Sequence, residues 1–381
     1  MRSSVVALLS LSILTLPAKA QWDLQDSHTT ASLRGIHSIG NGVAWASGTE
    51  GTILRTTDDG TTWQRCTTPL DADKLDFRGI QAFDQNTAIV MSSGKGDLSR
   101  LYKTTDACKS WKLVLTNPDP DGFWDAVTFA LTKPYPLRDG WQMHLAGSLI
   151  GDPVDGRFVI YQSTDSGSTW DRWANNRSER PAHASGTESL FAASNSAATY
   201  TRLFGDLCFV TGGEGGSHLF VLTYHDLFDG GFMWYDFNSK RLPITSSKTS
   251  GAFSIAGRGD QGESRTYVLV GGDYQHPEQA GAAVALPATA KSGPFQRPTA
   301  AQTPPHGYRS AVAYDAATKT WITVGPNGTD ISHDDGKNWT ALKPTPQDTP
   351  DADKNWNALS LPFVIGPKGR IGKLRIDAIK P

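Results

Sequence analysis

Five charged residues recur near the beginning of short apolar segments, at equivalent positions: Arg34, Arg78, Asp125, Glu188 and Arg309. Arginine binds carboxylates through a planar fork of N–H donors, and carboxylates bind cations or exchange protons. If the segments are repeats of one unit, these side chains gather around a common axis. The pattern predicts either a ligand site at that axis or a network of ion pairs that ties the repeats together.

Two further aspartates and two aromatic residues extend this set. Asp152 and Asp273 each follow an apolar segment, Trp124 precedes Asp125, and Tyr274 follows Asp273. Charged groups beside aromatic surfaces are typical of ligand pockets. We therefore take all nine residues as a candidate binding ring at the mouth of a central channel, and we assign no catalytic residue.

An octapeptide, Ser/Thr-x-Asp-x-Gly-x-x-Trp, occurs at 56–63, 163–170 and 332–339, and a fourth copy at 104–111 has cysteine in place of glycine. In such a turn, known as an Asp box, the carboxylate accepts backbone N–H bonds and glycine takes a positive φ. The tryptophan begins the next strand and packs between sheets. The residues with these structural roles are Asp58, Gly60, Trp63, Asp106, Trp111, Asp165, Gly167, Trp170, Asp334, Gly336 and Trp339. The four aspartates fall in different repeats, so we expect them apart, at the outer rim.

The three cysteines are Cys66, Cys108 and Cys208, with no CxxC pair and no histidine at metal-ligand spacing. We expect three buried or free thiols, although an exported protein can pair two of them. Cys108 replaces the turn glycine, so its turn should be the least regular. Neither a metal site nor a cofactor is predicted.

The elements that position these residues are seven short segments, spaced by about 44 to 65 residues, near the period of four-stranded blades. They lie at 34–36, 78–80, 124–127, 188–190, 252–255, 309–312 and 356–359. An apolar strand that ends in small residues follows each of them, as crowding near an axis requires. The pattern predicts an all-β fold, a single seven-bladed β-propeller over residues 21–381, with six or eight blades as alternatives.

The two ends of the chain complete one blade in this prediction. The last repeat lacks the octapeptide and its Trp-led fourth strand, whereas Trp22-Asp23-Leu24 resembles the strands that follow the octapeptides. We predict that this N-terminal strand pairs beside 370–374 and closes the ring, which removes free sheet edges.

The composition narrows the classes of protein. With 38 glycines, 22 prolines and 12 tryptophans among 381 residues, the chain favours short strands and turns over helices. The net charge of −2 argues against a nucleic-acid-binding protein, which usually has a basic face.

The first twenty residues have the features of a secretory leader. Arg2 is followed by an apolar run from Val5 to Leu16 and by Ala18-Lys19-Ala20. The run is too short to cross a bilayer, which needs about 20 apolar residues. We expect residues 1–20 to be a signal peptide cleaved after Ala20, and the mature protein to be periplasmic or secreted.

The mature chain resembles a known family over roughly residues 22–376. The residues that carry the resemblance are 51–60, 77–83, 97–100, 271–274, 307–314 and 325–330. They are similar to propellers with Asp-box repeats of the sialidase (BNR) type, and in particular to the photosystem II stability/assembly factor-like proteins of non-photosynthetic bacteria. The resemblance implies a protein that binds a partner on one propeller face, although one fold hosts many functions.

Two functional hypotheses follow. The first is a non-enzymatic scaffold that binds a protein or a cell-surface polymer, with no nucleic-acid partner. The second is a glycan hydrolase with acidic residues at the channel, since Glu188 with Asp125 or Asp152 could form a carboxylate pair. The arginine motif of sialidases is absent before the first octapeptide, which favours the scaffold.

Overall fold

The computed structural model describes residues 21–379 except 132–134, 138–139, 143–144, 174–177, 201–205, 226–233, 259–264, 289–295 and 345–347. The expected signal peptide lies outside the described residues. Short antiparallel strands make up most of the described chain, and η1 (Gly96–Leu98) and η3 (Ile376–Ala378) are single 3₁₀ turns.

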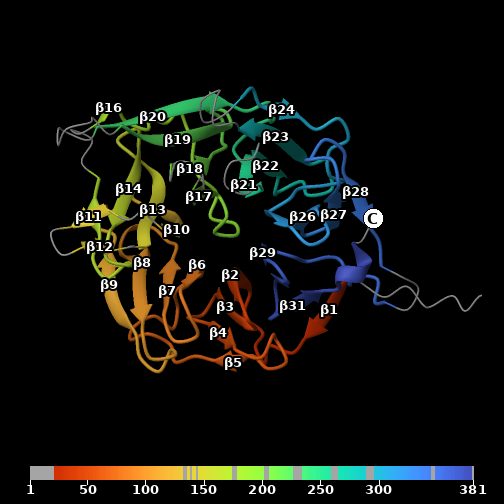
Figure 1. Ribbon diagram of the computed structural model, residues 1–381, viewed down its shortest axis with the longest axis horizontal. Helices are drawn as coiled ribbons and strands as arrows, with labels where there is room; N and C mark the ends of the chain where they lie inside the picture. The colour runs from red at the N-terminus through yellow and green to blue at the C-terminus, as the bar shows by residue number, and fades with distance from the viewer. Residues whose placement is uncertain are drawn as a thin grey trace, which may run out of the picture.

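Seven sheets form a closed ring around a central axis, and each sheet is one blade (Figure 1). Blade 1 consists of β2 (Leu33–Gly40), β3 (Val43–Gly48), β4 (Ile53–Thr56) and β5 (Gln64–Arg65). Blade 2 consists of β6 (Phe77–Ala82), β7 (Ala88–Ser92), β8 (Arg100–Thr104) and β9 (Lys112–Thr116). Blade 3 consists of β10 (Trp124–Leu131), β13 (Leu145–Val154), β14 (Arg157–Ser163) and β15 (Asp171–Arg172). Blades 4 and 5 are β17 (Ala198–Tyr200), β18 (Leu207–Val210), β19 (His218–His225), β20 (Trp234–Arg241); and β21 (Ser250–Arg258), β22 (Arg265–Asp273), β23 (Ala282–Ala288), β24 (Thr299–Ala300). Blades 6 and 7 are β25 (Ala311–Asp315), β26 (Thr320–Gly325), β27 (Gly328–Ser332), β28 (Thr340–Leu342); and β29 (Ala358–Ser360), β30 (Phe363–Ile365), β31 (Ile371–Leu374), β1 (Trp22–Gln25).

Two further strand pairings lie outside this four-stranded arrangement. β16 (Ser178–Arg180) pairs in parallel with β20, and β11 (Tyr135–Leu137) forms a hairpin with β12 (Gly140–Gln142). The seven-bladed all-β prediction is confirmed.

The predicted ring closure is also confirmed. β1 pairs antiparallel with β31, with Trp22 opposite Leu374 and Gln25 opposite Ile371. Trp22 is 1% exposed and donates from Nε1 to Thr329 Oγ1 of blade 6 at 3.1 Å. The N-terminal strand is therefore the outer strand of the last blade, and in Figure 1 the red β1 lies beside the dark blue β31.

The hydrophobic core lies between neighbouring blades. Trp45 of blade 1 packs in one cluster with Phe77 of blade 2, and Trp63 of blade 1 meets Phe363 of blade 7 with ring centroids 5.4 Å apart. Trp63, Trp170 and Trp339 are all buried. Each blade is thus stabilised mainly by its neighbours, because burying an aromatic side chain removes a large apolar area from water.

The octapeptide turns share one hydrogen-bond pattern. In the first, Asp58 Oδ1 accepts bonds from Thr56 Oγ1 at 2.8 Å and from Thr62 N–H at 2.9 Å, while Gly60 N–H donates to Thr56 Oγ1. Thr62 Oγ1 also donates to Asp58 Oδ2 at 2.6 Å. The bonds from the Thr62 side chain, the Thr62 N–H and the Thr56 side chain, in that order of effect, lower the pKa of Asp58 to about 2. Strands alternate in direction within a blade, so the turns between third and fourth strands lie at the opposite end of the ring from the beginnings of the inner strands.

Two expectations about cysteine are wrong. Cys66 and Cys108 form a disulfide that joins blades 1 and 2, and Cys208 is a buried free thiol. The turn at Cys108 is as regular as the others, since Cys108 N–H donates to Thr104 Oγ1 at 3.2 Å and Ser110 N–H donates to Asp106 Oδ1 at 3.0 Å. Cys108 achieves this by adopting a φ of 60°.

Candidate functional site

The inner strands of several blades carry a β-bulge at the same place. The bulged residues are Arg34, Arg78, Asp125 and Phe253, each between two residues that pair with consecutive positions of the second strand. A bulge bends the strand and redirects one side chain. Since all inner strands run in the same direction, these side chains lie at one end of the channel, which we call the mouth.

At the mouth, two arginines share one carboxylate. Arg78 Nε donates to Asp76 Oδ2 at 2.8 Å, and Arg34 Nε lies 4.0 Å from Asp76 Oδ1. All three side chains are partly exposed, at 31% for Arg34, 27% for Arg78 and 25% for Asp76. The trio therefore carries one excess positive charge that solvent can reach. Burial of part of the Arg34 side chain lowers its pKa, and Asp76 opposes that shift.

Asp125 and Asp152 form a buried pair of acids beside this trio. Asp125 is 2% exposed and its Oδ2 has no hydrogen-bond partner, whereas Asp152 Oδ1 accepts the Leu190 N–H at 3.0 Å. Burial raises the pKa of Asp152 to about 7. Burial and the neighbouring Asp152 raise the pKa of Asp125 well above its usual range. The two carboxyl groups together therefore keep one proton near neutral pH.

A segment that the sequence analysis missed crosses the channel at this end. Residues 190–197, between Glu188 and β17, reach towards the centre of the ring (Figure 1), and we call them the plug. Asn195 Oδ1 accepts from Val127 N–H at 2.9 Å, and its Nδ2 donates to the Val127 carbonyl at 3.1 Å. Ser194 Oγ donates to the Ser310 carbonyl at 2.7 Å, and Arg78 donates to the Ala192 carbonyl at 3.1 Å. The plug of blade 4 therefore connects blades 2, 3 and 6.

The plug also adds an aromatic residue to the mouth. Phe191 stacks on Phe253 with centroids 4.2 Å apart, and Tyr308 meets the edge of Phe253 at 4.7 Å. Tyr274 lies at the edge of Phe191, at 6.1 Å, and is 45% exposed. Beside it, Asp273 accepts a bond from Gln275 N–H and pairs with His276 at 3.0 Å. This aromatic group gives the mouth an apolar surface next to its arginines.

Three other members of the predicted ring are buried and offer no surface at the mouth. Arg309 is fully buried and paired with Asp330, and Trp124 is also fully buried. Glu188 is buried as well, where it accepts bonds from Thr211 Oγ1 and Ser185 N–H and pairs with His218 Nδ1 at 2.9 Å. Arg309 and Glu188 make these bonds within the repeats of blades 6 and 4, and Trp124 packs against blade 2. None of the three side chains is accessible to a partner.

The error at Arg309 has a simple cause. Ser310 N–H donates to the Val324 carbonyl, and Ala311 is the register partner of Val324, so Ser310 stands where Arg34 and Arg78 stand in their blades. Arg309 is one residue earlier and corresponds to Leu33 and Phe77, which are also fully buried. Matching residue types aligned Arg309 with Arg34 and Arg78, one position away from the alignment that the strand pairing gives.

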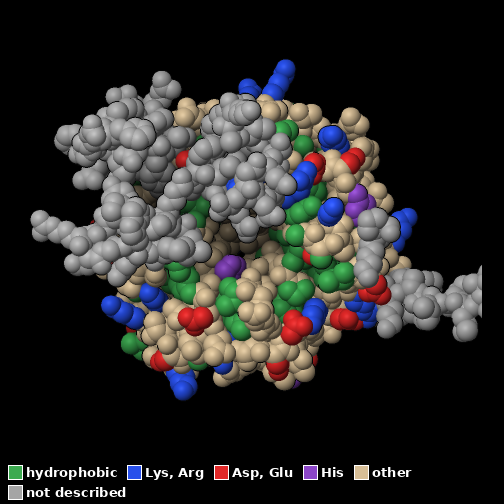
Figure 2. Space-filling view, in the orientation of Figure 1, with side chains coloured by type: hydrophobic (Ala, Val, Ile, Leu, Met, Phe, Trp, Pro, Cys, Tyr) green, Lys and Arg blue, Asp and Glu red, His purple; other side chains and the backbone are tan. Residues whose placement is uncertain are grey.

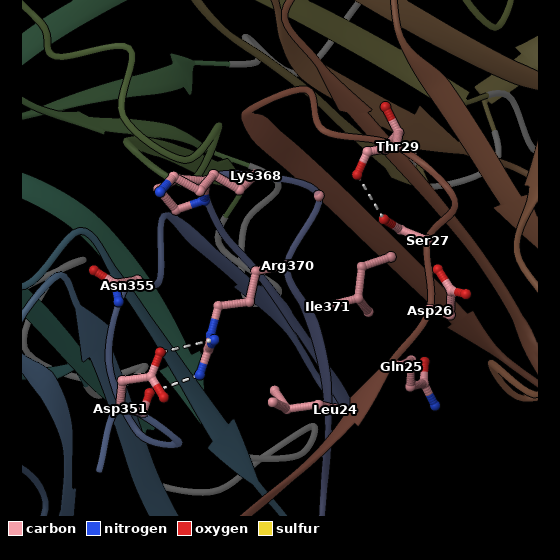
Figure 3. A pocket seen from close by; sticks show the side chains of 12 residues that line it. Leu24, Gln25, Asp26, Ser27, Thr29, Asp351, Asn355, Lys368, Arg370 and Ile371 are labelled. Carbon is pink, nitrogen blue, oxygen red and sulfur yellow. Dashed lines mark hydrogen bonds and ion pairs between the residues drawn. The ribbon is translucent and has the colours of Figure 1, made fainter. Parts of the chain in front are cut away.

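A separate pocket of about 430 Å³ lies at blade 7, where β1 and the residues after it meet the β30–β31 turn and the segment that precedes β29 (Figure 3). Arg370 points across it towards Asp351 at 3.3 Å and lies over the Trp356 ring at 4.7 Å. None of the nine predicted ring residues lines it.

Charge elsewhere is dispersed. On the face drawn in Figure 2, acidic and basic side chains are interspersed around the rim of the described part. Within the described residues, no cluster of three or more His, Cys, Asp or Glu side chains is placed to hold a metal ion. Nor does that part of the chain contain a helix long and apolar enough to cross a membrane.

The fold and site together define a seven-bladed β-propeller with a plugged channel and an arginine–aromatic mouth. Among solved structures, it is similar to YCF48 from Cyanidioschyzon merolae (16% identity, TM-score 0.58, covering 94% of this chain and 100% of that one) and to YCF48 bound to D1 peptide (16% identity, TM-score 0.55, 94% and 97%). It is also similar to the WD40 β-propeller domain of Doa1, at 8% identity and a TM-score of 0.54, covering 95% and 99%. No family model and no curated protein matches the sequence. At these identities the likeness establishes the fold.

Proposed function

We propose that this protein is a non-enzymatic scaffold that binds a segment of another protein at the channel mouth. The observation that carries the proposal is that Arg34 and Arg78 share the single carboxylate of Asp76. Arg78 also donates to Ala192 of the plug, and the adjacent plug residue Phe191 meets the exposed ring of Tyr274. The similar structure of YCF48 is described as bound to a peptide, which supports the same mode of use for this propeller.

The chemistry of the mouth indicates what a partner would offer. A guanidinium that is only partly neutralised favours a carboxylate, and an exposed aromatic edge favours an apolar or aromatic side chain. The plug closes the channel behind these groups, so a partner would lie across the mouth. An extended segment with an acidic group next to an apolar one fits best.

We also propose that the chain is an Asp-box propeller of the photosystem II assembly factor-like group from a non-photosynthetic bacterium. The shared bonding of the octapeptide turns supports this assignment. So does the convergence of the motifs around Arg78, Tyr274 and Tyr308 near one mouth.

Export to the periplasm or the medium is part of the proposal. The leader-like residues 1–20 support it, and so does the Cys66–Cys108 disulfide, because such bonds persist in oxidising compartments.

The hydrolase alternative gains no support from the described residues. Asp125 and Glu188 are each 2% exposed, so neither carboxylate is open to a glycan.

The test compares partner binding with stability. The tagged mature protein is cross-linked in the periplasm, and the captured partner is identified. The affinity of this partner is then measured for R34A, for R78A and for the control R65A, which removes an exposed arginine on β5. We expect R34A and R78A to weaken binding by about tenfold or more, as for loss of a charge-assisted bond, while R65A binds like the wild type. If R34A and R78A melt early and bind normally, the arginine pair is structural and the proposal fails.

A further inference from the structure

Gln21, the first residue of the fold, has an unusual environment for an amide side chain. The residue is 3% exposed, and neither Nε2 nor Oε1 of its side chain has a hydrogen-bond partner. Its main chain is well held, since its carbonyl accepts the Arg375 N–H at 2.8 Å, and Trp22 begins the outer strand of blade 7. A buried carboxamide that makes no hydrogen bond lowers stability.

Cleavage after Ala20 would add a second problem at this place. It would create an α-ammonium group on the residue whose carboxamide is buried, and drawing a charge away from water without a partner is costly. The carboxylate closest in sequence, Asp23, is already paired with Arg375. The mature N-terminus would then combine an unpaired charge with an unsatisfied amide.

We propose that mature Gln21 closes to an N-terminal pyroglutamyl lactam, so that Gln21 is a modification site of this protein. The proposal rests on the cleavage after Ala20 proposed above. In the reaction, the neutral α-amine attacks Cδ of the same residue, the new N–Cδ bond forms, the Cδ–Nε2 bond breaks, and ammonia leaves. No oxidant or co-reactant is needed.

The product suits this site better than the reactant does. The lactam is neutral, so the α-ammonium charge disappears, and the departing ammonia carries away the buried donor Nε2. Ring closure uses only atoms of Gln21 and leaves the Trp22–Leu374 pairing intact. The outer strand of the closing blade would then begin with a compact neutral ring, which amino-peptidases that need a free amine cannot attack.

The experiment uses the full chain expressed with its own leader, purified from the periplasm, together with the variant Q21N. Asparagine keeps a carboxamide, but its side chain is one carbon too short to form the five-membered lactam. For the wild type we expect an N-terminal peptide that starts at residue 21 and is lighter than unmodified glutamine by one ammonia. It should resist Edman degradation until pyroglutamyl aminopeptidase removes the ring.

Q21N should show a free amine at the same position and a melting temperature lower by a few degrees. A wild-type protein that starts at Gln21 with a free amine overturns the lactam proposal and leaves the cleavage proposal standing. An N-terminus at any other residue overturns both. Equal melting of the lactam form and Q21N would overturn the argument that burial of Gln21 favours the ring.

Discussion

Cys66, which follows β5 in blade 1, forms a disulfide with Cys108 of blade 2. Cys108 takes the turn position that glycine occupies in the other three octapeptides, as Gly60, Gly167 and Gly336. Cys108 has a φ of 60° there, in the left-handed region that glycine adopts freely and other residues adopt at a cost. The disulfide thus links two blades through a residue whose backbone is strained.

This relationship predicts two opposite effects. C66S should lower the free energy of unfolding by about 2–4 kcal/mol, because the cross-link no longer restricts the unfolded chain. Adding C108G to C66S should restore about 1 kcal/mol, because glycine relieves the strain at φ 60°. Denaturant unfolding of the two variants measures both changes. Reduced wild type should behave like C66S, and a double variant less stable than C66S would contradict the strain argument.

The ring closure predicts a global effect of one terminal residue. W22A should lower the free energy of unfolding by about 3–5 kcal/mol, because it removes a large buried side chain. The Nε1 of Trp22 donates a hydrogen bond to blade 6, and the centroid of its ring lies 6.0 Å from that of Trp356. The whole propeller should melt earlier in one transition, as followed by calorimetry. L24A is the control on the same strand, since Leu24 is 49% exposed and should change little. Loss of only a small, separate transition in W22A would show that the N-terminal strand does not hold the ring.

The features that could be predicted from the sequence are those that recur several times along the chain. Blade number, ring closure and the burial of Trp63 follow from a period that appears several times, so errors in one copy are corrected by the others. The plug occurs once and consists largely of Ala and Ser, without an apolar period, so nothing in its pattern distinguishes it from a surface loop. The Cys66–Cys108 pairing depends on how far apart two blades lie, which residue spacing does not encode. Arg309 was misplaced because its residue type matches Arg34 and Arg78, whereas the strand pairing puts Ser310 at their position.

The plug predicts a stability role for Asn195. N195A would leave Val127 N–H and carbonyl without their side-chain partners, and each unsatisfied buried group costs about 1–3 kcal/mol. We expect a total loss of about 2–4 kcal/mol in chemical denaturation. Asn195 also has a positive φ of 60°, so N41A serves as the control, because Asn41 is an exposed turn residue with a φ of 51°. If N41A loses as much stability as N195A, the loss reflects backbone strain and the bonds across the channel contribute little.

The buried acid pair predicts a pH dependence with a defined sign. The pKa of Asp152 is raised by burial to about 7, whereas an aspartate in the unfolded chain has a pKa of about 4. Between these values Asp152 binds a proton in the folded protein that it does not bind in the unfolded chain. The contribution of Asp152 to stability therefore falls as pH rises from about 4 to about 7 and then levels off. The charged groups that face the pair are Arg78 on β6 and the two acids themselves, Asp125 on β10 and Asp152 on β13.

D152N cannot ionise and keeps an oxygen that accepts the Leu190 N–H, so it should lose part of this pH dependence. Asp125 still titrates in D152N, and only D125N/D152N should remove the remaining contribution. We expect D152N to match the wild type near pH 4 and to exceed it near pH 8 by on the order of 1–3 kcal/mol, measured by denaturant unfolding at each pH. Parallel pH curves for wild type and D152N would show that Asp152 is ionised in the folded protein throughout this range.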